Sequence, residues 1–202
     1  KLAQTLWRKL FPEKLEEADA HLNGVIYECL QKEQWHRAQM LAEFARGQKR
    51  LSSDMMHKII SINLAIAYKF SGKQQKMEKV LVETDWTAAV PDFRLAEAVL
   101  LERYEDASKI MKRIASQSEI INEASYHIWP LFRHFRTTDI FLQTYEDIYS
   151  RTFAAAIREM MLSNELTEEV IRDVTESLEV VISEQSNEGN KRMGTDNDEG
   201  EG

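Results

Sequence analysis

Five histidines and a large set of carboxylates are the residues of this chain that could act as acids, bases or metal ligands. Two ligands on one helix face need a spacing such as His-Glu-x-x-His, and none of the five histidines has it. Glu123 precedes His127 by four residues, which places both side chains on one helical face. Such a pair often arises by chance, so the sequence predicts neither a metal site nor an acid–base pair there.

The single cysteine and the seven glycines exclude several other kinds of chemistry. One cysteine cannot form an internal disulfide or a cysteine-based zinc site, and Cys29 stands where a helix packs inward, which favours a buried, inert thiol. The glycines form none of the motifs G-x-x-x-x-G-K-[ST], G-x-G-x-x-G and G-x-S-x-G. We therefore predict no catalytic residue, no metal and no cofactor, in a protein that is not an enzyme.

The spacing of apolar residues predicts an all-α fold. Apolar residues recur every three or four positions almost throughout, and no alternating strand pattern appears. Ser52–Asp54 and Thr138 are suited to capping helix starts, and Gly72 is suited to the left-handed residue that ends a helix. The predicted helices cover about 2–10, 13–32, 35–48, 53–70, 73–84, 92–101, 104–116, 119–135, 139–149, 153–163 and 167–184.

The charge of the chain is unevenly distributed. The net charge is −8, but 164–202 alone carries twelve acidic and three basic residues, so 1–163 is nearly neutral. Within that body, Gln31–Lys79 holds ten basic residues against four acidic ones. Most such excesses are solvated helix faces; as a binding surface, this one would favour an acidic peptide. It has too few interleaved aromatic residues to indicate nucleic acid.

Small or medium apolar residues recur in the second helix of four predicted helix pairs. The first members of these sets lie 39, 30 and 34 residues apart, close to the roughly 34 residues of a tetratricopeptide repeat. The sets are Ala38, Ala42 and Ala45; Met77, Leu81 and Thr84; Ala107, Met111 and Ile114; and Phe141, Tyr145 and Ile148.

The second pair, with Leu64-Ala65-x-Ala67-Tyr68, then Gly72, Met77 and Leu81, resembles the tetratricopeptide consensus. Ile26 and Trp129 stand where the family has a small residue, so the repeats are degenerate. The resemblance implies a short right-handed solenoid of about four helix pairs over 20–150. An N-terminal helical segment (1–19), capping helices (151–184) and a disordered acidic tail (185–202) complete the predicted organisation. The alternative is a non-repetitive helical bundle.

Two segments at the C-terminal end have alternative interpretations. The aromatic run His127–Arg136 is predicted to close the stack as core, with Trp129, Phe132 and Phe135 structural; the alternative is an aromatic ligand pocket. The apolar stripe from Leu166 to Ile182 is predicted to cap the stack, the alternative being a short dimer seam. The acidic tail either is simply solvated or competes with partners for the basic surface.

The resemblance implies a non-catalytic interaction module or scaffold that holds a peptide or partner helix in its groove. Asn23, Asn63, Lys69 and Lys73 are the predicted partner-binding residues, although Ala89 and Phe93 leave a carboxylate clamp incomplete. The alternative is a regulatory or sensor domain appended to a larger, bacterial multidomain enzyme, with which a Lys at position 1 agrees. We expect a cytoplasmic protein with a protein or peptide partner, no nucleic acid and no membrane contact.

Overall fold

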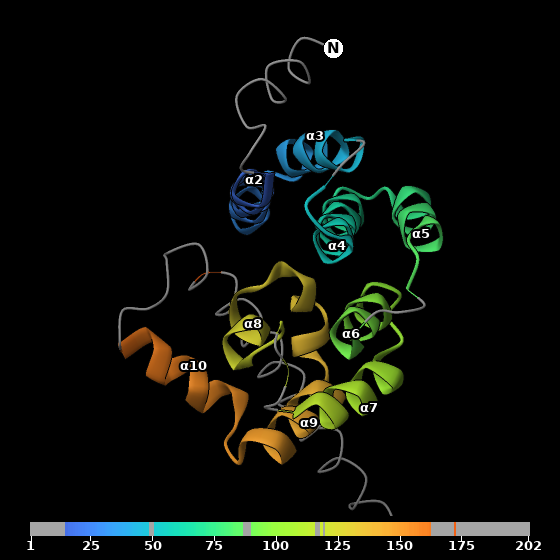
Figure 1. Cartoon of the computed structure of the whole chain (residues 1–202). Helices are drawn as coiled ribbons and strands as arrows, with labels where there is room; N and C mark the ends of the chain where they lie inside the picture. Colours follow the sequence, from blue (N-terminus) through green and yellow to red (C-terminus); the bar gives the residue numbers. More distant parts are fainter. Residues whose placement is uncertain are drawn as a thin grey trace, which may run out of the picture.

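The computed structural model describes residues 15–48, 51–86, 90–115, 118, 120–162 and 172. All regular secondary structure in these residues is helical, which confirms the predicted all-α class (Figure 1). The α-helices are α2 (Leu15–Gln31), α3 (Trp35–Arg46), α4 (Asp54–Phe70), α5 (Gln74–Glu83), α6 (Pro91–Leu100), α7 (Tyr104–Ile114), α8 (Glu123–Ile128), α9 (Asp139–Tyr149) and α10 (Phe153–Leu162). Two 3-10 helices, η2 (Pro130–Phe132) and η3 (Phe135–Thr137), lie between α8 and α9.

Helix boundaries follow the capping residues that the sequence predicts. The Ser53 hydroxyl accepts a hydrogen bond from the Met56 amide at 3.1 Å and begins α4. The Thr138 hydroxyl does the same for α9, accepting from the Phe141 amide at 3.3 Å. Gly72 has a φ of 72°, the left-handed conformation expected after α4. These three predictions are confirmed.

One predicted helix is wrong. The pattern over 119–135 predicts a continuous helix, but α8 ends at Ile128 and two short 3-10 helices follow. Pro130 explains the break, because proline disfavours the helical conformation in the residue before it, and Trp129 is extended with φ −81° and ψ 121°. The predicted helices over 2–10 and, apart from residue 172, over 167–184 lie outside the described residues, as does the predicted acidic tail.

The turns α2–α3, α4–α5 and α6–α7 have the same backbone structure. In each, one residue has a positive φ, namely 56° at Glu33, 72° at Gly72 and 57° at Glu102. The next residue donates its amide proton to the carbonyl five residues earlier. These bonds are Gln34 N to Cys29 O at 2.8 Å, Lys73 N to Tyr68 O at 2.9 Å and Arg103 N to Ala98 O at 2.9 Å. Three successive hairpins therefore repeat one geometry, with offsets of 39 and 30 residues.

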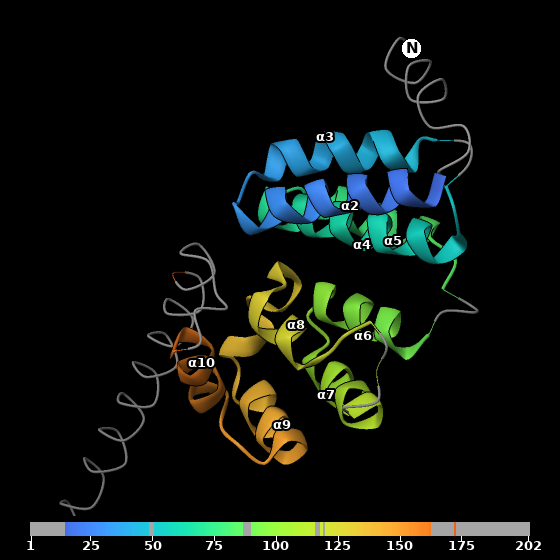
Figure 2. The ribbon, with the colours of Figure 1, turned by 60° about the vertical axis from the view of Figure 1, so that its left-hand side comes forward.

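The same offsets relate the buried positions of the second helices. Ala38, Met77 and Ala107 are fully buried, and so is Phe141 at the start of the fourth set. The alanines among these positions let neighbouring helices approach closely, and α3, which carries Ala38, packs extensively on both α2 and α4. Figure 2 shows α2–α5 as a layer of nearly parallel axes above α6 and α8. Helices α4 and α6 contact each other and join the two layers.

The segment after α8 is anchored on the first hairpins. Arg133 forms an ion pair with Glu33 at 3.0 Å, in the turn between α2 and α3. Its guanidinium also lies over the rings of Trp35 and Phe70, 5.6 and 5.4 Å from their centroids. Cys29 is buried, as predicted. Residues a hundred positions apart thus meet at one edge of the molecule.

Candidate functional site

A surface pocket of about 540 Å³ lies between α3, α4 and α5, and we call it the α3–α5 pocket. Its floor includes Leu64 and Val80, which are buried apolar side chains. Its walls carry charged and polar groups from all three helices. These groups are Glu43, Arg46, His57, Tyr68, Lys76, Lys79 and Glu83.

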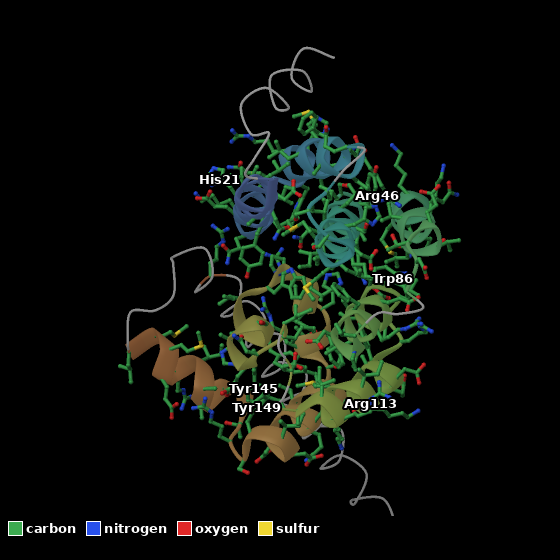
Figure 3. All side chains as sticks on the ribbon, viewed as in Figure 1. His21, Arg46, Trp86, Arg113, Tyr145 and Tyr149 are labelled. Atoms are coloured by element: carbon green, nitrogen blue, oxygen red, sulfur yellow. The ribbon has the colours of Figure 1, made fainter. Side chains whose placement is uncertain are left out.

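Helical spacing places these groups on the pocket walls. Lys76, Lys79 and Glu83 stand at successive intervals of three and four residues, which puts them on one face of α5. Glu43 and Arg46 are three residues apart at the end of α3, beside the buried face formed by Ala42 and Ala45. Figure 3 shows Arg46 in the upper layer of helices, pointing toward the space between α4 and α5.

The acidic side of the pocket is occupied by internal hydrogen bonds. Glu43 Oε1 accepts from Gln39 Nε2 at 2.9 Å and from the Tyr68 hydroxyl. Burial and the bond to Glu43 raise the pKa of Tyr68 to about 12, so its hydroxyl stays a proton donor at neutral pH. Two donors from within the chain thus hold the Glu43 carboxylate in place.

The basic side has donor capacity left over. Glu83 contacts both Arg46, at 3.4 Å, and Lys79, at 3.7 Å, so one carboxylate serves two cations. Arg46 Nε is buried and has no hydrogen-bond partner in the described part of the chain. Lys76 has no carboxylate partner among those residues and lies 5.6 Å from the centroid of the Tyr68 ring. A buried N–H without an acceptor is rare in folded proteins.

His57 adds a neutral group to the same pocket. Burial lowers the pKa of His57, and the nearby Arg46 lowers it further. The imidazole is therefore neutral at pH 7 and can accept or donate a hydrogen bond. The pocket combines an apolar floor, spare cationic donors and a neutral imidazole, an arrangement that suits a carboxylate group next to an apolar one.

The structure brings two of the predicted groove residues together but leaves them little exposed surface. Asn63 Nδ2 donates to Asn23 Oδ1 at 2.9 Å, and Asn63 is only 1% exposed. The Trp129 indole, 66 residues further along, donates to Asn63 Oδ1 at 3.3 Å. The face of α2 and α4 on which these residues lie is thus covered by the chain itself.

The two predicted lysines also have partners within the chain. Lys69 Nζ donates to the Leu100 carbonyl at 2.9 Å and pairs with Glu102 at 2.9 Å, which ties the end of α4 to the end of α6. Lys73 donates to the side-chain oxygen of Gln39. Since Gln39 also binds Glu43, Lys73 belongs to the hydrogen-bonded network behind the α3–α5 pocket. A partner-binding role for these residues stays a prediction.

A second polar cluster lies where α8, α9 and α10 meet. The Tyr145 hydroxyl donates to Glu123 and lies 2.8 Å from His127 Nε2. Burial opposes the charge on Glu123, but hydrogen bonds from Tyr145 and Arg151 outweigh it and lower the pKa of Glu123. Burial lowers the pKa of His127 to about 4. His127 is only 1% exposed, so this cluster has a structural role.

Sequence reasoning missed the α3–α5 pocket, although a signal for it was present. The basic segment Gln31–Lys79 contains Arg46, Lys76 and Lys79, and the spacing of the last two with Glu83 marks one helix face. The missing information is which face of α5 meets α3 and α4, because that depends on contacts between helices distant in sequence.

The described part of the chain is thus an all-helical protein with three repeated helical hairpins and a polar pocket between the first two. None of its helices is both long and apolar enough to cross a membrane. No group of three or more histidine, cysteine or acidic side chains suited to a metal ion occurs in the same residues. Comparisons with protein families, curated protein sequences and solved structures give no match.

Proposed function

We propose that this protein is a non-catalytic interaction module with tetratricopeptide-like helix pairs, which binds an acidic segment of a partner protein in the α3–α5 pocket. The repeated hairpin geometry supports the first half of this proposal, because stacked helix pairs present extended surfaces for peptides. The pocket supports the second half. Its chemistry suits recognition, with cationic side chains around an apolar floor.

The unpaired donors at the pocket carry the proposal. Arg46 Nε is buried without an acceptor, and the exposed Lys76 ammonium has only the Tyr68 ring beneath it. A carboxylate beside Lys76 would gain a charge-assisted hydrogen bond there, and it would compete with Glu83 for Arg46, whose ion pair is 3.4 Å long. Leu64 and Val80 in the floor would accommodate an apolar neighbour of that carboxylate. The preferred ligand is therefore a segment with acidic and apolar residues interleaved.

A displayed library of random peptides tests the proposal even though the partner is unidentified. Selection on the full chain should enrich sequences in which Asp or Glu stands next to an apolar residue. Synthetic peptides from the selected group should lose about tenfold or more in affinity on Lys76→Glu, because an attractive charge becomes a repulsive one. Affinity should also fall as salt rises, since exposed charges are screened over roughly 8–10 Å.

Arg158→Glu is the matched control, because it makes the same charge change at an exposed position on the remote helix α10. It should leave peptide affinity within about twofold of the wild type, as expected for a distant charge that salt screens. Selected peptides without acidic residues would contradict the proposal. So would equal loss of affinity in Lys76→Glu and Arg158→Glu, which would indicate a general charge effect.

A further inference from the structure

The hairpin that carries the α3–α5 pocket has a counterpart 30 residues later. The α4–α5 turn and the α6–α7 turn share the same hydrogen bond at 2.9 Å, from Lys73 N to Tyr68 O and from Arg103 N to Ala98 O. Gly72 and Glu102 have the same left-handed conformation in these turns. Residues 61–70 of α4 therefore correspond to α6, and α5 corresponds to residues 104–113 of α7.

A second surface pocket, of about 400 Å³, occupies that corresponding place between α6 and α7, and we call it the α6–α7 pocket. Val80 in the first pocket corresponds to Ile110 in the second, and Lys79 corresponds to Lys109. Each pocket thus has an aliphatic side chain at its base and a lysine on its wall at matching positions. The repeat that relates the two hairpin backbones thus also relates some of the side chains that line the two pockets.

The second pocket is smaller than the first, and its lining carries four basic side chains instead of three, with two acidic ones in each, although Lys76 of the first pocket corresponds to Asp106. Tyr68, whose ring lines the first pocket, corresponds to Ala98, which leaves space. Glu83, an acid in the first pocket, corresponds to Arg113 in the second. Helix α3 walls the first pocket, whereas all the lining residues of the second come from α6, α7 and the turn between them.

Four basic and two acidic side chains line the α6–α7 pocket. Glu97 contacts Arg94 at 3.4 Å and Arg103 at 3.9 Å, and Asp106 contacts Lys109 at 3.4 Å. Arg113 has no carboxylate partner within the described part of the chain and is exposed. These three ion pairs are long and lie at the surface, where an ion pair is worth about 1 kcal/mol or less, so an incoming carboxylate can compete with them.

We infer that the α6–α7 pocket is a second subsite for acidic residues, and that one acidic segment of a partner protein engages both pockets. The inference rests on the proposed function and extends it by naming where the rest of the ligand binds. Arg113 is the principal cation of the second subsite, with Lys109 beside it. In Figure 3, Arg46 in the upper layer and Arg113 in the lower layer appear on the same side of the molecule, with Trp86 between them.

The experiment uses fluorescein-labelled peptides on the full chain. One peptide carries a single block of glutamates, and the others carry two blocks joined by flexible Gly-Ser linkers of several lengths. Two linked blocks should bind about tenfold or more tightly than one block at the best linker length, because the second contact becomes intramolecular. The single block should bind at two sites per protein, as measured by calorimetry.

Charge reversal distinguishes the two pockets. Arg113→Glu combined with Lys109→Glu should remove the gain from the second block and reduce the single-block stoichiometry to one, with thermal unfolding unchanged. Lys76→Glu, which reverses a charge in the α3–α5 pocket, should also remove the gain from the second block and reduce the stoichiometry to one. Arg158→Glu should change neither the gain nor the stoichiometry. If the double variant keeps the two-block gain and the two-site stoichiometry, the second subsite is overturned.

Two other outcomes separate this inference from the proposal on which it rests. Single-block binding at one site, lost in Lys76→Glu and intact in the double variant, overturns the second subsite and leaves the proposed function standing. Single-block binding that ignores Lys76→Glu overturns the proposed pocket instead. A single-stranded DNA of equal charge that binds as tightly as the two-block peptide, with the same sensitivity to the reversals, overturns the assignment of a protein partner.

Discussion

Helices α2–α5 and the C-terminal unit α8–α10 place their polar groups in opposite ways. In the first region, small residues such as Ala38 and Ala42 fill contacts between helices, and five charged side chains lie around a surface pocket. In the second region, aromatic rings fill the core, and a polar cluster is centred on the buried side chains of Tyr145 and His127. The first arrangement leaves donors available to a ligand, whereas the second uses its donors to hold three elements together.

This difference assigns separate roles to the two regions. The charged surface of α2–α5 can change without loss of its core, because the charged side chains on the pocket walls lie outside the core, to which the floor residues Leu64 and Val80 belong. In α8–α10 the packing and polar residues contact one another, since the His127 ring lies 5.0 Å from the Phe153 ring and hydrogen-bonds to Tyr145. Stability should therefore depend mainly on the second region and binding on the first.

The largest effect should come from the aromatic core. Phe141 is fully buried, and its ring centroid lies 5.1 Å from that of Phe135 and 5.2 Å from that of Phe153. Phe141→Ala should lower the free energy of unfolding by about 3–5 kcal/mol, because it removes ring contacts and leaves a cavity. Urea denaturation measures this. A loss below about 1 kcal/mol would mean that the ring is not packed as the structure shows.

The next effect depends on pH. His127 has a pKa of about 4 in the folded protein, below its ordinary value of 6.5, because burial disfavours its charged form. The unfolded chain therefore binds a proton more readily between these two values, and the stability contributed by this group is complete above pH 6.5 and falls as the pH drops toward 4. The loss across this range should be a few kcal/mol.

His127→Gln isolates this contribution, because glutamine can still hydrogen-bond to Tyr145 but does not titrate in this range. The variant should show a shallower decline of stability between pH 6.5 and pH 4 than the wild type. His57, whose pKa is also lowered, contributes to both proteins and cancels in the comparison. Parallel stability curves for the two proteins would contradict a buried neutral His127.

The sequence predicts most of the helices and their ends, but it does not predict which distant surfaces meet. Local signals sufficed for Ser53, Gly72 and Thr138, because a cap depends on neighbours within a few residues. Pro130 is also a local signal. The predicted helix over 119–135 is wrong because the prediction gives apolar periodicity more weight than the missing N–H of this proline. The contact of Trp129 with Asn63 spans 66 residues, and no local pattern encodes it.

A smaller effect should appear at the link between the two layers. Lys69→Met keeps the aliphatic stem but removes the donor to the Leu100 carbonyl and the ion pair with Glu102. Stability should fall by about 1–2 kcal/mol, because the carbonyl at the end of α6 loses its partner. The hydrogen bond and charge of Lys69 lower the pKa of Glu102, so that pKa should rise toward 4.5 in an NMR titration.

Lys112→Met is the matched control for this variant. It removes an ion pair with Asp147 in which both side chains are largely exposed. Such a pair contributes about 0–1 kcal/mol, so the control should cost less than Lys69→Met and leave the pKa of Glu102 unchanged. Equal losses in the two variants would show that Lys69 is no more than a surface charge, and its role as a link between α4 and α6 would be wrong.

The smallest effect on stability should come from the α3–α5 pocket, where the largest effect on binding is expected. Lys76 is exposed and lies over the Tyr68 ring, a cation–π interaction worth about 0.5–1 kcal/mol. Lys76→Glu should therefore change the unfolding free energy by no more than that amount, while it weakens acidic peptides about tenfold. Binding and thermal unfolding measured on one preparation test both halves. A variant that unfolds easily would show that the pocket lysine supports the fold, and the separation between a binding region and a stabilising region would fail.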